Sequence, residues 1–190
     1  MATTDAVAHY LIDTRTSRFT VRVFASGLLS SFGHNPTIGV REYSGEATFV
    51  PGSLGQAFVK ISVQSDSLEV MNDISQKDRL EIESKMRQEV LETSSYPQMV
   101  FESTQCSANK MGENSYTLNV SGNFTLHGVT RSETVYAQAA LMGDTLRAYG
   151  EFSLRQTDYG ITPVSVAGGS LKVKDEVKVS FDLEFLKPSA

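Results

Sequence analysis

The chain has 190 residues, a length that suits one domain with a sizeable hydrophobic core. Its hydrophobic share of 40% and charged share of 21% are ordinary for a globular protein. The formal net charge of −5 argues against nucleic acid as a partner, because phosphate binding needs a basic patch. The single cysteine, Cys106, excludes an intrachain disulfide.

The N-terminal segment, residues 1–10, has neither the basic nor the apolar part of a signal peptide. No stretch of the chain approaches the ~18 consecutive apolar residues of a membrane-spanning helix. We therefore expect a soluble, cytoplasmic protein without stable membrane insertion. A periplasmic location would require a longer precursor.

Alternating apolar and polar residues predict a series of strands in the first half of the chain. In residues 17–25, Phe19, Val21 and Val23 share one face, and arginine and threonine residues occupy the other. The other strands predicted in this half are residues 9–13, 38–50 and 57–68.

The period changes between residues 75 and 91, which predict the one substantial helix of the chain. Ser75 followed by Asp78 resembles a capping box, with aspartate in place of the usual glutamate. Three apolar residues recur at every fourth position, and we expect this stripe to pack on the strands: Ile82, Met86 and Val90.

The second half of the chain is centred on a predicted hairpin at residues 116–141. Its first strand alternates strictly, and its second strand places Val135 and Ala137 on one face. The connection at residues 127–130 supplies a glycine where the chain must reverse. The remaining predicted strands are residues 99–106, 146–155 and 171–186.

These elements amount to about eight antiparallel strands and one helix in a single domain, residues 1–190. Short connections between long strands are typical of an up-and-down barrel or of a sandwich. A closed barrel removes both sheet edges, which favours it for strands of this length.

The inward faces of the predicted strands mix phenylalanines with alanines and glycines. This pattern does not decide between a filled interior and a ligand cavity. Because these faces are apolar, any ligand should be mostly hydrocarbon, with about 0.8 kcal/mol gained for each buried methylene. The residues that we predict to line a tunnel are Phe19, Val21, Val23, Phe49, Ile61, Val63, Met99, Phe101, Phe124, Leu126, Val135, Ala137, Phe152, Leu154, Val179 and Phe181.

Five segments resemble, in order, the strands of the YceI-like family of lipocalin-fold polyisoprenoid-binding proteins. They are residues 10–13 (YLID), 43–45 (YSG), 96–104 (YPQMVFEST), 122–130 (GNFTLHGVT) and 152–161 (FSLRQTDYGI). The resemblance covers nearly the whole chain. It implies an elongated, eight-stranded antiparallel barrel of lipocalin type with one flanking α-helix. It also implies a long isoprenoid or similar amphiphilic lipid as partner, a possible homodimer, and no family-wide catalytic activity.

Polar residues in and beside two loops could meet the head group of such a ligand: His34, Arg155, Asp158 and Tyr159. Arg155 is the best donor among them for a carbonyl or phosphate oxygen. The alternative is that Arg155 and Asp158 pair with each other and only hold their loop in place.

Neither catalytic motifs nor metal-ligand spacing can be recognised in the sequence. A nucleophile elbow, a Walker loop, a dinucleotide-binding glycine motif and a zinc-protease motif are all absent from the sequence. The 3 histidines are dispersed, so we expect no metal and no cofactor other than a bound lipid.

Our leading hypothesis is non-catalytic binding, transport or storage of a long apolar lipid, a polyisoprenoid or an isoprenoid quinone, inside the barrel. One alternative is an enzyme that acts on such a lipid, which would need a polar cluster inside the barrel. Another is a protein-interaction module with a filled barrel and the acidic helix as its contact surface.

Overall fold

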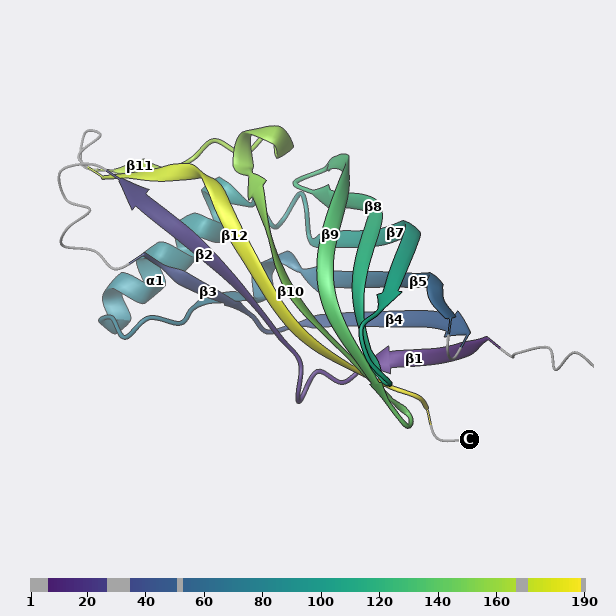
Figure 1. Cartoon of the computed structure of the whole chain (residues 1–190). Coiled ribbons are helices and arrows are strands. Elements are labelled where there is room, and N and C mark those ends of the chain that lie inside the picture. Colours follow the sequence, from purple (N-terminus) through teal and green to yellow (C-terminus); the bar gives the residue numbers. More distant parts are fainter. Residues whose placement is uncertain (1–6, 27–34, 51–52, 167–170, 189–190) are drawn as a thin grey trace, which may run out of the picture.

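The computed structural model describes residues 7–26, 35–50, 53–166 and 171–188, most of which lie in antiparallel strands (Figure 1). Eight strands form a ring that closes where β1 pairs with β12. In order around the ring they are β1 (Ala8–Ile12), β4 (Tyr43–Val50), β5 (Ser53–Gln64), β7 (Gln98–Lys110), β8 (Ser115–Leu126), β9 (Val129–Met142), β10 (Thr145–Arg155) and β12 (Leu171–Leu186). The ring confirms the predicted eight-stranded antiparallel barrel.

A second set of strands, which we call the branch, leaves the ring at β12. β12 pairs with β2 between residues 172 and 182, and with β1 only at Phe185 and Leu186. The branch and β1 therefore lie toward opposite ends of β12 (Figure 1). The branch consists of β2 (Arg18–Ser26), β3 (Thr37–Val40) and β6 (Leu68–Val70), and a short β11 (Ser165–Val166) pairs with the start of β12.

The single strand predicted over residues 38–50 is wrong, because the structure divides it into β3 and β4 on either side of Arg41 and Glu42. β3 pairs with β2 and β6 in the branch, whereas β4 pairs with β1 and β5 in the ring. The chain thus passes from one set of strands to the other at this point. Neither glycine nor proline stands there to mark the break.

The helix follows β6 and lies beside the branch (Figure 1). The hydroxyl of Ser75 accepts a hydrogen bond from the backbone N–H of Asp78 at 3.1 Å, which is the predicted cap. The helical elements of the described chain are α1 (Gln76–Lys85), a π-helical turn η2 (Met86–Val90), and two short turns, η1 (Ser65–Ser67) and η3 (Gln156–Tyr159).

A buried carboxylate, rather than the apolar stripe alone, attaches the helix to the branch. Glu83 is 7% exposed and accepts a hydrogen bond from the backbone N–H of Val70 at 2.9 Å. Val70 belongs to β6, the last strand of the branch, whose backbone would otherwise form an open edge. Of the predicted stripe, Met86 and Val90 pack against the core, but Ile82 is 39% exposed.

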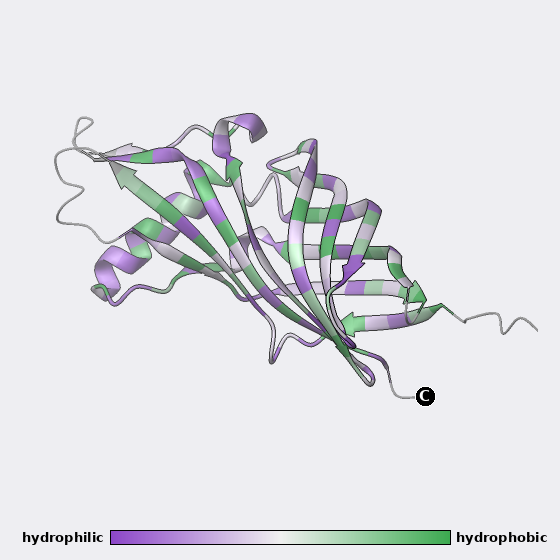
Figure 2. Cartoon of the chain, viewed as in Figure 1, coloured by the Kyte–Doolittle hydropathy of each residue, from purple (hydrophilic) through white to green (hydrophobic). Residues whose placement is uncertain are grey.

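The buried apolar residues form two clusters, one toward each end of the barrel. We call the first the β1-end cluster, and its buried members include Tyr10, Phe49, Tyr116, Leu183 and Phe185. We call the second the helix-end cluster, and its buried members include Val70, Leu91, Leu126, Leu154 and Tyr159. Along the ring strands apolar and polar residues alternate (Figure 2), which is the predicted two-residue period. Among the described residues, the structure holds no helix of the length and apolarity that crossing a bilayer requires.

Candidate functional site

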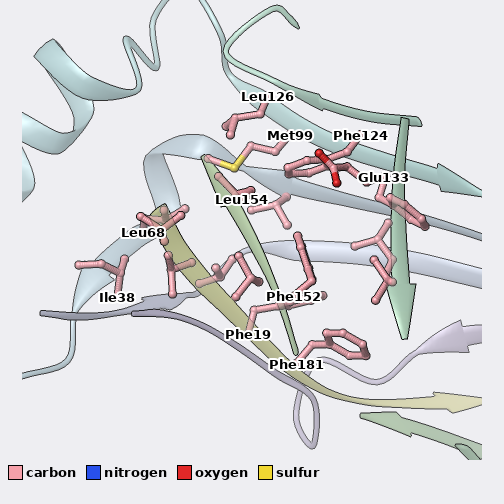
Figure 3. Close-up of a pocket in the computed structure, with 18 of the residues that line it drawn as sticks. Phe19, Ile38, Leu68, Met99, Phe124, Leu126, Glu133, Phe152, Leu154 and Phe181 are labelled. Carbon is pink, nitrogen blue, oxygen red and sulfur yellow. The ribbon is translucent and has the colours of Figure 1, made fainter. Parts of the chain in front are cut away.

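The interior of the barrel contains a cavity of about 670 Å³, part of which is drawn in Figure 3. This volume lies within the range of about 300–1,000 Å³ that is typical of ligand pockets. The lining comes from the ring, the branch and the helix, and it is predominantly aliphatic and aromatic. The described part of the barrel is therefore hollow rather than filled, which resolves the choice that the sequence left open.

Every residue predicted to line a tunnel borders this cavity, from Phe19 on β2 to Phe181 on β12. The reason is the strict alternation of the strands, which places every second residue on the inner face. Contact of these residues with a ligand stays a prediction. The lining also includes residues that the prediction omitted, among them Ile38, Leu68, Leu118, Val120, Ala148 and Val177.

Two glycines provide room for phenylalanine rings against the barrel wall. A Cβ atom on Gly122 would lie 2.7 Å from Cζ of Phe101 and 2.5 Å from the carbonyl oxygen of Glu102. A Cβ atom on Gly150 would lie 2.9 Å from Cζ of Phe181. Real Cβ atoms do not approach other atoms this closely, so each ring occupies the space that a side chain would fill.

Charged residues border the cavity on the side of the helix. The acidic residues Asp78 and Glu81 of α1 are exposed to solvent and also line the cavity, as does the apolar Ile82. Lys85 borders it from the same helix and pairs with Glu81 at 3.4 Å. Because these side chains contact both solvent and the cavity, we infer that the cavity opens beside α1.

The predicted head-group residues do not meet at one site. The side chain of Arg155 is 67% exposed and donates a hydrogen bond to Oδ2 of Asp175 at 2.9 Å, not to Asp158. Asp158 is exposed, and only its backbone carbonyl accepts a hydrogen bond, from Arg131 at 3.4 Å. The pairing of Arg155 with Asp158 is therefore wrong, because Asp175 is the carboxylate within reach. His34 lies outside the described residues.

Tyr159, the remaining member of that set, is fully buried beside the cavity. Its hydroxyl donates a hydrogen bond to Oε1 of Glu133 at 2.6 Å, and its ring meets that of Phe124 edge-on at 5.6 Å. Burial, and then the hydrogen bond to Glu133, raise the pKa of the Tyr159 phenol well above its usual value. Tyr159 is therefore a neutral hydrogen-bond donor at physiological pH.

Glu133 and Gln156, which the prediction from the sequence did not include, both line the cavity. Glu133 is two residues before Val135, so extending the alternation by one step would have placed it on the inner face. Gln156 is 8% exposed and donates a hydrogen bond to the carbonyl oxygen of Lys174 at 2.9 Å. Otherwise the predicted apolar character of the inner face is correct.

The turn η3, which carries Gln156 and Tyr159, is held by Asp175 on β12. Besides Arg155, Asp175 accepts hydrogen bonds from the backbone N–H of Thr157 at 2.8 Å and from its hydroxyl at 2.7 Å. These bonds, Thr157 before Arg155, lower the pKa of Asp175. Asp175 lies where the register of β12 against β2 shifts, between Val173 and Val177.

The thiol of Cys106 also borders the cavity, and burial raises its pKa, which disfavours the reactive thiolate. His9 and His127 each pair with one glutamate, at 2.9 and 2.7 Å. Within the described ranges, no three His, Cys, Asp or Glu side chains are grouped so that they could hold a metal ion.

Comparisons with known proteins relate the whole barrel to one family. The structure is similar to that of BcnA from Burkholderia cenocepacia, with a TM-score of 0.70 and 19% identity over 91% of this chain and 98% of that one. It is also similar to a polyisoprenoid binding domain from Saccharophagus degradans implicated in plant cell wall breakdown, with a TM-score of 0.67 and 16% identity over 96% of this chain and 100% of that one.

A third similar structure is the YceI protein of Campylobacter jejuni, with a TM-score of 0.60 and 15% identity over 80% of this chain and 85% of that one. At such identities, the structures establish a shared fold only. No curated protein sequence matches the chain. The family model for the YceI-like domain matches residues 10–185, so the chain belongs to the YceI-like family.

Proposed function

We propose that this protein binds one long apolar lipid, a polyisoprenoid or an isoprenoid quinone, inside its barrel and transports or stores it without chemical change. The observation that carries the proposal is the cavity of about 670 Å³ with its predominantly apolar lining. Each methylene that leaves water for such a lining contributes about 0.8 kcal/mol, so a long hydrocarbon chain needs few polar contacts. The similar domain from Saccharophagus degradans, described as polyisoprenoid binding, supports this choice of lipid.

The two other functions considered from the sequence have less support. A protein-interaction module with a filled barrel conflicts with the cavity. An enzyme would need an activated nucleophile or an acid–base pair at the ligand. Among the described lining residues there is no histidine, and burial raises the pKa of the Cys106 thiol, the lining group closest to a nucleophile.

The proposal includes the cellular setting that we expect from the sequence. The protein would act in the cytoplasm, or in the periplasm if a longer precursor exports it. The bound lipid would be its only cofactor-like ligand. Family resemblance adds a homodimer to the proposal.

Native mass spectrometry of protein purified gently from its own host, followed by organic extraction, tests the proposal directly. We expect one long-chain lipid per chain, released by the solvent and identified by its fragments. Protein with the mass of the bare polypeptide that also takes up no added prenyl lipid would contradict it.

A pair of variants relates the bound lipid to the cavity. Ala137→Phe adds a ring to a lining position on β9, and we expect it to lower the lipid content at least several-fold. Ser132→Phe adds the same ring to an exposed position on the same strand and should leave the lipid content unchanged. Equal loss in both variants would indicate general destabilisation rather than competition for the cavity.

A further inference from the structure

Glu133 places a carboxylate inside the otherwise apolar part of the cavity. Its side chain extends from the inner face of β9, and Figure 3 shows its oxygens among the carbon atoms of the lining. Glu133 is half-buried, and a carboxylate partly removed from water is costly unless hydrogen bonds or a cation compensate it. The hydrogen-bond partners of Glu133 therefore indicate which polar group of a ligand could bind in the cavity.

One oxygen of the carboxylate already has a partner. The hydroxyl of Tyr159 donates to Oε1 at 2.6 Å, and Tyr159 itself is fully buried. The turn that carries Tyr159 is fixed by Asp175, which binds both Arg155 and Thr157. The orientation of Glu133 is thus set before any ligand arrives.

The other oxygen, Oε2, has no hydrogen-bond donor among the residues that the structure describes. Arg131 is the nearby cation that acts on the Tyr159 phenol, but its guanidinium is exposed and donates to the carbonyl oxygen of Asp158. An ionised carboxylate only accepts hydrogen bonds, and an apolar environment strengthens each bond that it makes. The cavity therefore presents one oriented, strong acceptor.

We propose that Oε2 of Glu133 accepts a hydrogen bond from a hydroxyl group of the bound lipid, so that the protein selects isoprenoid alcohols or hydroquinones. This inference rests on the proposed function, because it concerns the polar end of the lipid that the cavity holds. A matched hydrocarbon leaves the acceptor unsatisfied. A phosphate or carboxylate head group would meet a like charge, so the same residue discriminates against anionic lipids.

Binding of three probes that share one chain tests the selection: geranylgeraniol, geranylgeranyl phosphate and the parent hydrocarbon. We expect the unaltered protein to bind the alcohol about tenfold or more tightly than the hydrocarbon, the range of one charge-assisted hydrogen bond. The phosphate should bind more weakly than the alcohol.

Two substitutions assign the preference to Glu133. Glu133→Leu should bind the alcohol and the hydrocarbon about equally, with hydrocarbon binding retained or improved. Glu133→Gln keeps an amide oxygen as acceptor but removes the charge, so it should keep part of the preference for the alcohol and bind the phosphate better. Glu102→Leu removes an exposed carboxylate from the neighbourhood of Lys60 and is the control for lost charge, with no change expected.

The outcomes separate this inference from the proposed function. Failure of all three probes to bind the unaltered protein overturns the proposed function and this inference with it. Binding of all three without preference for the alcohol, or an alcohol preference that persists in Glu133→Leu, overturns the inference alone. Should Glu133→Leu fail to fold, Glu133→Gln and the probe series on the unaltered protein still decide the question.

Discussion

The two ends of the barrel are closed in different ways. At the β1 end, backbone pairing between β1 and β12 completes the ring, and the rings of Tyr10 and Phe49 stack at 4.8 Å inside it. At the helix end, the strands diverge into the branch, and α1 covers the last edge through the hydrogen bond from Val70 to Glu83. The first closure uses buried aromatic surface and a short backbone pairing within the ring. The second combines the apolar packing of Met86 and Val90 with polar contacts between α1 and the edge of the branch.

From this difference we expect the two ends to open at different costs. The β1 end closes through a buried aromatic core and strand pairing within the ring, so we expect it to open only when the protein unfolds. Because α1 covers a strand edge from outside the ring, it can separate locally, and we expect the helix end to open at a lower cost in free energy. Variants at each end should therefore change different properties.

The largest effect is expected from Phe49→Ala at the β1 end. Phe49 is 1% exposed and stacked on Tyr10, so its truncation should lower the free energy of unfolding by about 3–5 kcal/mol. Urea denaturation measures this loss. The matched variant at the helix end, Ile82→Ala, starts from a side chain that is 39% exposed and should cost less than about 1 kcal/mol. Similar losses in both variants would contradict the division between the ends.

An intermediate effect is expected from Glu83→Ala, which removes the acceptor for the backbone N–H of Val70. Leaving that buried donor unsatisfied should cost about 1–3 kcal/mol, and the loss should be local. Hydrogen exchange should become faster in β6 and α1 while the amides of β1 and β12 stay protected. Glu81→Ala, at an exposed position of the same helix, is the control and should change neither region.

The smallest effect concerns acid stability at the turn after β1. Hydrogen bonds from the side chain and the backbone N–H of Arg15 lower the pKa of Asp13 from 3.8 to about 2. A lowered pKa in the folded state means that this contribution is complete above pH ~4 and is lost as the pH falls toward about 2.

Thermal unfolding between pH 5 and pH 2 tests this dependence. Asp13→Asn should show a shallower fall of the melting temperature across that window than the unaltered protein. Asp144→Asn, at a side chain that is 80% exposed, should reproduce the unaltered profile. Parallel profiles for all three proteins would show that Asp13 does not contribute.

Most of the strands of the barrel could be predicted from the sequence, and every residue predicted to line the tunnel borders the cavity. Both follow from the alternation of apolar and polar residues, which is local information. Val135 and Ala137 face inward for the same reason as Phe19 and Val21. The division of β3 from β4 could not be inferred, since it depends on which distant strands pair with each part. Glu133 also faces inward, but the prediction began the inner face at Val135 because Glu133 is charged.

The predicted grouping of the head-group residues was wrong for a different reason. The sequence places Arg155 and Asp158 beside a loop, but the orientation of Arg155 depends on Asp175, which belongs to another strand. The hydrogen bonds of Asp175 set the turn that directs Arg155 outward and Tyr159 inward. Such a contact between distant segments leaves no trace in local periodicity.

The pairing of Leu11 with Leu186 also has a consequence for the order of events in the cell. The seam of the barrel joins two residues that have nearly the whole chain between them, and contacts of this kind form slowly. On the ribosome, β12 is made after every other strand of the ring, and without it β10, β2 and β1 each lack a neighbour. The ring therefore cannot close, and the cavity cannot form, until β12 has been made.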